Sequence, residues 1–469
     1  MPARPADRRL AVLVAGAFFM ENLDGTIIAT AAPRMAGSLG VRPVDVNVVM
    51  TAYLLTLGVL IPVSGWVADR YGARRVFAVA ITGFTVASGL CAVAGSLPVL
   101  VAVRVLQGAG GALMVPVGRL VVLRTTPKAQ LITAIAYLTW PALVAPVVAP
   151  ALGGLLVSYL SWRWIFLINL PLGALALLAA LRLVPAWREP TPAGLDWPGF
   201  LVGGAGLAGL LYGLEGIGGR TSSPLPVLVG LVLGVLGCGL AGRHLLRAEH
   251  PLLDLRSLRI ATFRAANLGG SFFRVAISAV PFLVPLLLQD AFGRSPLRAG
   301  LLVMAIFAGN ILIKPATTPL LRRFGFRPVL LVNGTAAALA IAACALLSPD
   351  TPQLVVVAVL FAGGVFRSIS FTAYNTITFA DIPPERTSSA NALSSTVFQV
   401  TVGMGVAIGA LALRLGGPLS RAVGWAGDPA GAFRVAFLTM AALALVAVVD
   451  TWRLAPDAGA AVSGATASG

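Results

Sequence analysis

The chain has 469 residues, of which 58% are hydrophobic and only 11% are charged. Soluble domains carry about 25% charged residues, and a chain this apolar cannot hide its side chains in a water-soluble core. The net charge of +17 does not indicate nucleic-acid binding, because the arginines lie mostly in short connections between apolar runs, as is typical of membrane proteins.

Runs of about 20 apolar residues recur along the chain, and each is long enough to cross a bilayer as a helix. We therefore predict an all-α integral membrane protein with fourteen transmembrane helices. In chain order, the expected helices span residues 10–32, 44–67, 76–95, 98–121, 129–156, 164–184, 197–216, 226–241, 265–289, 297–321, 329–347, 354–378, 390–413 and 433–449.

The connections between these helices alternate in charge. Every second connection is rich in arginine or lysine, whereas the intervening segments 96–98 and 348–353 contain no cation. Short basic loops stay in the cytoplasm, so the basic side is expected to be cytoplasmic. Both termini should then lie there, as an even number of helices requires. The connection after the thirteenth helix departs from this pattern, because it contains Arg414 and Arg421.

The sequence offers no signal for catalysis or for a cofactor. Cys91, Cys238 and Cys344 each fall in a different apolar run, so they are interpreted as small apolar residues. His244 and His250 lie in a polar segment without metal-ligand spacing, and there is no glycine loop of the ATP-binding type. We expect neither an enzyme nor a bound metal or cofactor.

The loop GWVADRYGARR between the second and third helices is suited to a tight turn. Gly65 permits close helix contact, Asp69 can cap a helix or pair with a cation, and Gly72 allows the turn. A similar segment, TPLLRRFGFRP, lies between the tenth and eleventh helices and indicates an internal duplication, with Arg322 in the place of Asp69. Three cations of the first loop are expected to hold the cytoplasmic face: Arg70, Arg74 and Arg75.

These motifs resemble the major facilitator superfamily and, more narrowly, its fourteen-helix drug:proton antiporters. GWVADRYGARR is similar to the superfamily's loop between helices 2 and 3, and RVLQGAGGA, which begins at Arg104, is similar to the antiporters' helix 4. Further stretches that resemble this branch are LDGTIIATAAP, WRWIFLINLPLG, LDWPG and IPPERTSSANALSSTVFQ. The resemblance covers residues 10–413.

The resemblance implies two six-helix halves of the major facilitator type with two extra helices between them. The first helix of each three-helix repeat would line a central cavity, which makes helices 1, 4, 9 and 12 the cavity wall. The expected divisions are 1–184 (N-terminal half), 185–241 (two inserted helices), 242–264 (cytoplasmic linker), 265–453 (C-terminal half) and 454–469 (disordered tail). Within the linker, HPLLDLRSL fits either a short interfacial helix or a plain basic segment.

The fifth helix departs from the antiporter pattern, which is a Gly-Pro pair followed by two residues and Gly-Gly. The corresponding stretch, APVVAPALGG, has Ala149 where glycine is expected. Pro146 and Pro150 should still bend this helix, and Gly153 and Gly154 should still allow close packing. The resemblance implies that this helix limits leakage in exporters, so export stays the favoured direction and uptake stays open.

Charged residues at membrane depth are costly and are therefore functional candidates. In FFMENLDGTIIATAAP, Glu21 and Asp24 lie three residues apart and share one helix face. At the rise of an α-helix they lie about 16 and 21 Å above the inner membrane edge, and Arg104 lies at about 25 Å. Asp24 and Arg104 can therefore meet. We predict that these three residues couple protons, with Asp24 favoured as the proton carrier and Glu21 for substrate choice.

The C-terminal half carries cations at membrane depth instead. Arg274, Lys314 and Arg367 lie at about 14, 10 and 16 Å by the same count. Together with Glu21, they are the expected substrate ligands, although Lys314 could also reach the inner interface. Weaker polar candidates are Asn310, Tyr374, Asn375 and Gln399. The alternative is that such charges snorkel or form static ion pairs, which is the expectation for Arg119, Asp290 and Glu215.

The sequence thus predicts a proton-coupled secondary transporter of the inner membrane, in the first place an exporter of drugs or amphiphilic small molecules by alternating access. Two acids against four cations favour anionic, zwitterionic or neutral substrates. Proton-coupled uptake, export of a specific metabolite, and a membrane sensor or scaffold on a transporter fold stay open as alternatives. The expected partners are a small-molecule substrate, protons and the lipid bilayer, with no nucleic acid, and the resemblance implies a monomer.

Overall fold

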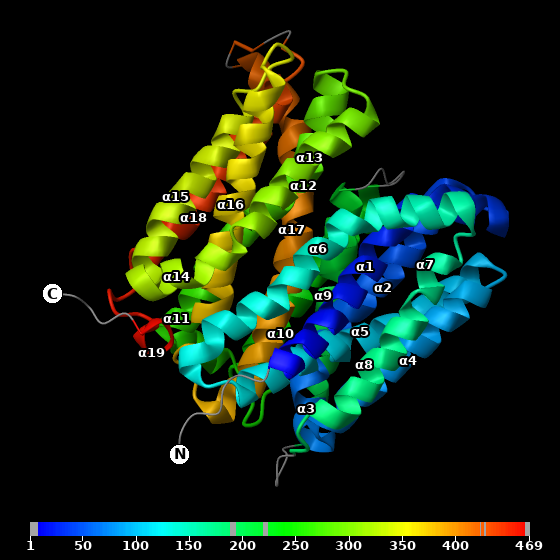
Figure 1. Cartoon of the computed structure of the whole chain (residues 1–469), viewed down its shortest axis with the longest axis vertical. Coiled ribbons are helices and arrows are strands. Elements are labelled where there is room, and N and C mark those ends of the chain that lie inside the picture. Colours follow the sequence, from blue (N-terminus) through cyan, green and yellow to red (C-terminus); the bar gives the residue numbers. More distant parts are fainter. Residues whose placement is uncertain (1–7, 188–193, 219–223, 423, 426–427, 465–469) are drawn as a thin grey trace.

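The computed structural model describes residues 8–187, 194–218, 224–422, 424–425 and 428–464, and in these ranges the chain is helical without any strand (Figure 1). Among the described residues, thirteen helices are long and apolar enough to cross a membrane. The number becomes fourteen when α13 (Pro296–Leu312) and α14 (Lys314–Phe324), which meet at a 49° bend, are counted as one span. This confirms the predicted all-α membrane fold.

The N-terminal half forms one bundle, drawn in blue to cyan in Figure 1. Its main packing pairs are α1 with α6 and α4 with α5. Its elements are α1 (Arg8–Leu39), η1 (Pro43–Val46), α2 (Asn47–Leu60), η2 (Ile61–Val63), α3 (Ser64–Tyr71), α4 (Ala73–Val93), α5 (Leu97–Thr125), η3 (Lys128–Gln130), α6 (Leu131–Tyr159), α7 (Trp164–Leu167) and α8 (Asn169–Leu183).

The C-terminal half forms a second bundle beside the first, drawn in green to red. Here α13 packs on α16, α12 on α17, and α15 on α18. Besides α13 and α14, its elements are α11 (Ala261–Arg264), η5 (Ala265–Gly269), α12 (Gly270–Leu286), η6 (Leu287–Ala291), α15 (Phe326–Cys344), α16 (Gln353–Ile377), η7 (Pro384–Arg386), α17 (Thr387–Ala422) and α18 (Gly431–Thr451).

The two similar loops of the sequence turn in the same way. Gly72 separates α3 from α4 at φ +88°, and Gly325 separates α14 from α15 at φ +74°. Both angles lie in the left-handed region, which glycine adopts without steric cost because it has no Cβ. A glycine turn of the same hand thus ends the second span of each half, which supports the internal duplication.

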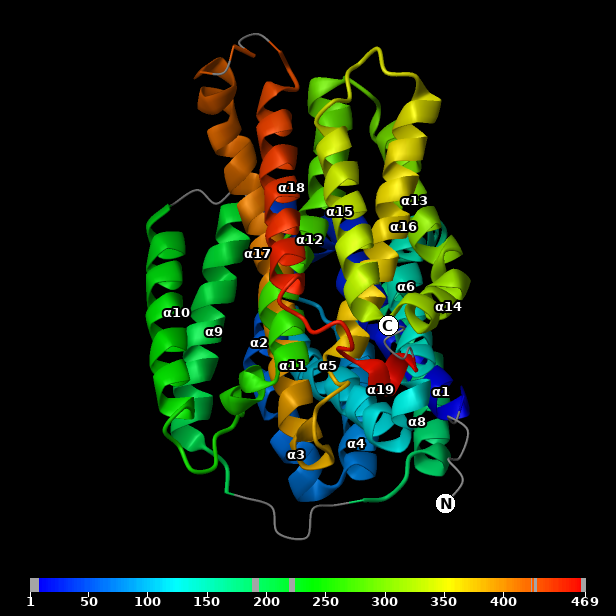
Figure 2. The ribbon, with the colours of Figure 1, turned by 90° about the vertical axis from the view of Figure 1, so that its left-hand side faces the viewer.

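The two inserted helices form a hairpin at the side of the molecule (Figure 2). They are α9 (Trp197–Gly218) and α10 (Pro224–Leu245), and glycines line the contact between them. A Cβ at Gly206 would lie 2.6 Å from the backbone nitrogen of Cys238, so only glycine allows this approach. The outer helix α10 exposes most of its leucines, whereas α9 packs against α2 and α17. The hairpin therefore covers the seam between the halves.

The hairpin begins at the sequence LDWPG. Asp196 precedes α9 and accepts a hydrogen bond from the backbone N–H of Gly199 at 2.9 Å, which is the geometry of an N-cap. Its carboxylate also contacts Nε2 of His244 at the end of α10, at 2.7 Å, and accepts the N–H of Leu252 at 3.2 Å. One side chain thus ties both inserted helices to the linker.

The linker is folded and packs against the C-terminal half. Part of HPLLDLRSL forms the 3-10 helix η4 (Leu255–Arg259), which Asp254 caps by accepting the N–H of Arg256 at 3.0 Å. The backbone N–H of Asp254 donates to the hydroxyl of Ser389 in α17 at 2.7 Å. A short helix therefore forms in part of this segment, and Leu252 and Leu253, which precede it, are buried within the protein.

The tail prediction is wrong for residues 454–464. This segment forms turns and the one-turn helix α19 (Ala460–Ser463), and the side chains of Leu454 and Val462 are buried. α19 packs against η3 and α6 of the N-terminal half and against α14 of the C-terminal half. The apolar side chains of this short segment are buried by packing between the halves, which composition alone does not reveal. Residues 465–469 lie outside the described ranges.

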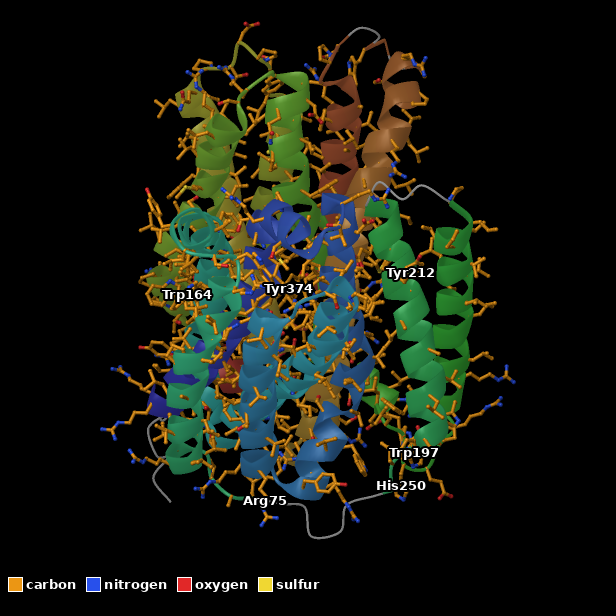
Figure 3. The ribbon with its side chains drawn as sticks, turned by 90° about the vertical axis from the view of Figure 1, so that its right-hand side faces the viewer. Arg75, Trp164, Trp197, Tyr212, His250 and Tyr374 are labelled. Atoms are coloured by element: carbon orange, nitrogen blue, oxygen red, sulfur yellow. The ribbon has the colours of Figure 1, made fainter. Side chains whose placement is uncertain are left out.

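Both ends of the described chain lie toward the lower side of Figures 1 and 2, which we call the terminal face. Figure 3 places Arg75, Trp197 and His250 at the same end of the molecule. One apolar cluster near this face joins the halves, since it includes Ile132 of α6 as well as Ala390 of α17. Other clusters, toward the opposite face, stay within one half. In the described part of the chain, the apolar cluster that joins the two bundles therefore lies near the terminal face.

Candidate functional site

A buried ion pair lies in the interior of the N-terminal half. Asp24 on α1 is 1% exposed and Arg104 on α5 is 0% exposed, and Nη1 of Arg104 contacts Oδ2 of Asp24. Oδ1 of Asp24 accepts from the side-chain amides of Gln107 at 2.9 Å and Asn169 at 3.0 Å. The same two amides donate to the hydroxyl of Ser88. The Asp24 carboxylate is therefore compensated by one cation and two neutral donors.

The guanidinium of Arg104 is held on several sides. Its Nη1 donates to Oε1 of Gln107 at 2.6 Å, and its Nε donates to the carbonyl of Val49 at 3.4 Å. Its Cζ lies 4.0 Å from the ring centroid of Tyr53, a cation–π distance. The pair of Asp24 and Arg104 is thus a rigid element that joins α1, α2 and α5.

Glu21 lies one turn before Asp24 on α1 but has a different environment. Its Oε2 is buried and has no hydrogen-bond partner among the described residues, and the same holds for the hydroxyl of Tyr53. Gly111 of α5 lies beside both groups: a Cβ there would be 3.1 Å from Oη of Tyr53 and 3.7 Å from Oε2 of Glu21. Oε2 of Glu21 therefore lacks the hydrogen-bond donors that surround Asp24.

Sequence reasoning missed the neutral donors around Asp24. Gln107 follows Arg104 by three residues in RVLQGAGGA, so both share one helix face. Asn169 lies within WRWIFLINLPLG and begins α8. Both residues lie in stretches that carry the family resemblance. An amide side chain within an apolar run of such a stretch could have identified them as candidate hydrogen-bond donors.

Two arginines at membrane depth in the C-terminal half, the buried Arg274 and the half-buried Arg367, are only partly satisfied. Arg274 on α12 donates from Nη2 to the carbonyl of Ala266 at 2.8 Å, while its Nε has no partner within the described ranges. Arg367 on α16 has a buried Nη1 that is likewise unpartnered there, and its side chain lines a small apolar cavity with Ile277 and Ile306. These guanidiniums retain N–H groups that a ligand could use.

Lys314 lies at the contact between the halves. It begins α14 directly after the 49° bend, and its side chain is buried. Its Nζ donates to the hydroxyls of Thr372 in α16 at 2.7 Å and of Thr139 in α6 at 3.1 Å. The structure therefore places this cation in the interface of the bundles rather than among the arginines on α12 and α16.

The weaker polar candidates occupy different places. Tyr374, labelled in the interior of Figure 3, is buried within the C-terminal half, and its hydroxyl lies 3.2 Å from that of Thr451 in α18. Asn310 is also buried, with both side-chain polar atoms unpartnered in the described part of the chain. Gln399 on α17 is half-buried. Asn375 differs from them, because its Oδ1 accepts from Nη2 of Arg119 in the other half at 3.1 Å.

Further hydrogen bonds close the terminal face between the halves. The hydroxyl of Ser388 in α17 donates to the carbonyl of Gly65 in α3 at 3.1 Å, and the amide of Asn391 donates to the carbonyl of Pro116 in α5 at 2.9 Å. A Cβ at Gly65 would lie only 3.0 Å from the carbonyl oxygen of Ser388. The backbones of α3 and α17 therefore touch at Gly65.

The loop motif is engaged in this closed end. Asp69 forms an ion pair with Arg124 at 3.2 Å, and the guanidinium of Arg124 lies 3.9 Å from the ring centroid of Trp187. Arg74 donates to the carbonyl of Leu181 in α8. The side chains of two loop cations are exposed on the terminal face: Arg70 and Arg75. The motif thus fixes α3, α4, α5 and α8 relative to one another.

The fifth span, α6, contains its prolines inside the helix: Pro141, Pro146 and Pro150. Gly153 packs closely against α1, because a Cβ there would lie 2.2 Å from Oγ1 of Thr30 and 2.9 Å from Ile27. Gly154 has no atom within 4 Å of its would-be Cβ. The prediction of close packing therefore holds for Gly153 and is wrong for Gly154, because only one of two successive residues can face a single neighbouring helix.

Comparison with known proteins agrees with this arrangement. The Major Facilitator Superfamily model matches residues 14–406 and 266–467. A protein named multidrug resistance protein MdtD from Escherichia coli O6:H1 is 39% identical over 436 residues, which are 92% of this chain and 91% of that protein. A protein of the same name from Shigella flexneri serotype 5b is 40% identical over 410 residues, 86% of each chain.

Two solved structures share the fold at low sequence identity. The human organic anion transporter MFSD10 superposes with a TM-score of 0.65 at 15% identity and covers 96% of this chain and 100% of its own. The proton:xylose symporter XylE gives a TM-score of 0.63 at 13% identity, with 95% of both chains covered. The chain therefore belongs to the Major Facilitator Superfamily and is a multi-pass membrane transporter of small molecules, not an enzyme.

Proposed function

We propose that the chain is a proton-coupled exporter of small amphiphilic molecules that works by alternating access in the inner membrane. The relatives named as multidrug resistance proteins support export and drug-like substrates. The terminal face would be cytoplasmic, because short loops rich in arginine stay on that side. The conformation described above would then be closed toward the cytoplasm and face the outside.

The contrast between two carboxyl groups on α1 carries the proposal of proton coupling. Asp24 accepts hydrogen bonds from Arg104 and two amides, so its charge is compensated. Glu21 Oε2 is buried without a partner among the described residues. Burying an uncompensated charge costs several kcal/mol, and a proton taken up from outside removes that charge. We therefore assign the proton to Glu21 and a positioning role to Asp24 and Arg104, which reverses the roles predicted from the sequence.

The cations of the C-terminal half support a substrate that is neutral, zwitterionic or anionic. Arg274 and Arg367 retain unpartnered N–H groups, and the described residues place no carboxylate in contact with either guanidinium. A lipophilic monovalent cation would meet two uncompensated positive charges there. Substrates limited to such cations in transport assays would contradict this part of the proposal.

The test compares Glu21→Gln with Asp24→Asn in proteoliposomes. Glu21→Gln is expected to abolish substrate accumulation driven by an imposed pH gradient but to leave substrate counterflow. The reason is that the substrate site is intact and only the group that takes up the proton is lost. Asp24→Asn removes the counter-charge of the buried Arg104. Breaking a buried ion pair costs about 3–5 kcal/mol, so this variant should lose both activities and unfold more readily.

Unchanged gradient-driven transport by Glu21→Gln would refute its proton role. The direction is tested separately with vesicles acidified either inside or outside. Antiport moves substrate against the flow of protons, whereas substrate movement in the direction of proton flow would identify symport and overturn the proposal of export.

A further inference from the structure

A cavity of about 250 Å³ opens on the terminal face, away from the ion pair of α1 and α5. Four helices surround it: the start of α1, the end of α5, the start of α6, and α14 of the other half. The proposed transport mechanism uses none of its lining residues. Its wall combines two cations with hydroxyl groups, and the residues that matter for the argument are Arg8, Arg322, Thr126, Thr133 and Tyr137.

No acid among the described residues compensates the charge of this cavity. Arg8 comes from the N-terminal half and Arg322 from the C-terminal half, and the described lining residues include no carboxylate. Nη2 of Arg322 donates to the carbonyl of Ala129 at 3.4 Å, which leaves most of its N–H groups for another partner. Arg8 forms no ion pair with any described residue. Two guanidiniums facing one space favour an anion with several acceptor oxygens, such as a phosphate group.

The rest of the wall is suited to an anion that carries apolar chains. Leu10, Val122 and Ala134 contribute apolar surface to the cavity and are themselves buried. Tyr137 is 38% exposed, so the cavity is bounded on that side by an amphipathic ring of the kind found at the membrane interface. Basic pockets between transmembrane helices on the cytoplasmic side bind the head groups of anionic lipids.

We propose that this cavity binds the phosphate group of an anionic phospholipid from the leaflet at the terminal face. The phosphate accepts hydrogen bonds from Arg8 and Arg322, the threonine hydroxyls contact its glycerol oxygens, and the acyl chains leave past Tyr137. Because the two arginines belong to different halves, the bound lipid stabilises the conformation in which the terminal face is closed. Anionic lipid is thus an allosteric ligand of the transporter.

The test uses the purified full-length protein and thermal unfolding in detergent micelles. The protein is titrated with phosphatidylglycerol in one arm and with phosphatidylcholine in a second arm. A third arm uses glycerol phosphate, which has no acyl chains. We expect phosphatidylglycerol to raise the unfolding temperature in a saturable way, and the other two compounds to leave it unchanged. Equal stabilisation by phosphatidylcholine would overturn an anion site, and equal stabilisation by free glycerol phosphate would overturn the assignment to a lipid.

Variants test whether the response to phosphatidylglycerol depends on the two arginines of the cavity. The double variant Arg8→Gln with Arg322→Gln should raise the half-saturating concentration of phosphatidylglycerol at least tenfold. Arg323→Gln is the matched control, because Arg323 neighbours Arg322 on α14, is exposed and does not line the cavity. Arg322→Lys retains the charge and should keep most of the response, which guards against a folding defect in the double variant. An unchanged half-saturating concentration in the double variant would refute the proposal.

Discussion

Gly65 offers a direct test of how the terminal face closes. A Cβ added by Gly65→Ala would lie 3.0 Å from the carbonyl oxygen, 3.1 Å from the hydroxyl and 3.3 Å from the carbonyl carbon of Ser388. Two of these atoms are backbone and cannot rotate away, so α3 and α17 must separate. The substitution therefore penalises only the conformation in which these two helices touch.

The size of the effect follows from the contact that is lost. Overpacking of this kind costs about 1–3 kcal/mol, and the hydrogen bond from Ser388 to the Gly65 carbonyl contributes about 0.5–1.5 kcal/mol. The higher helix propensity of alanine acts equally in both conformations and cancels. Together the two terms amount to about 1.5–4.5 kcal/mol, which shifts the equilibrium about 10- to 2,000-fold toward the conformation open at the terminal face.

The assay is the distance distribution between spin labels on the terminal face. Arg75→Cys and Arg323→Cys place labels on exposed positions of the two halves, in a protein whose three native cysteines are replaced. Gly65→Ala should populate longer distances. Gly83→Ala is the control, because a Cβ at Gly83 would meet no atom within 4 Å. An identical distribution for Gly65→Ala and the control would refute the reasoning.

Two further predictions concern stability, measured by unfolding in mixed detergent micelles. Gly153→Ala should be less stable than Gly154→Ala by about 1–3 kcal/mol, because only the first methyl group collides with α1; equal stability would contradict that packing. Asp196→Ala should cost about 0.5–2 kcal/mol, the range for replacing an N-cap residue by alanine. Burial alone would raise the pKa of Asp196, but hydrogen bonds from Gly199, His244 and Leu252 outweigh it and lower the pKa. At pH values above the usual pKa of an aspartate, the charged Asp196 side chain therefore stabilises the fold, and this contribution is lost as the pH falls through the lowered pKa. A variant with unchanged stability at pH 7 would argue against this role.

Several features of the site could be predicted from local sequence. Helix periodicity placed Glu21 and Asp24 on one face of α1, and the helical rise placed Asp24 at the depth of Arg104, with which it forms an ion pair. These predictions succeed because they need only the geometry of a single helix and the thickness of the membrane. The two glycine turns were predictable for the same reason, since φ at one residue is a local property.

The different environments of the two carboxyl groups could not be predicted in this way. Asp24 is compensated because α5 and α8 bring Gln107 and Asn169 to it, whereas Glu21 points to a place where no described donor reaches it. Which of the two acids receives hydrogen bonds depends on donors from helices far away in the sequence. The depth of the two carboxyl groups in the membrane does not show which of them has hydrogen-bond donors around it.

The sequence by itself determined the membrane class, the spans and the family, because the length of an apolar run, the charge of a loop and the order of short motifs are properties of the chain. The tertiary structure decided what helices do to one another: that Lys314 bridges the halves, that Gly153 and not Gly154 meets α1, and that α19 packs between the bundles. The physical reason is that a helix presents many side chains at the same depth. Only lateral packing selects which of them have a hydrogen-bond or ion-pair partner and which have none.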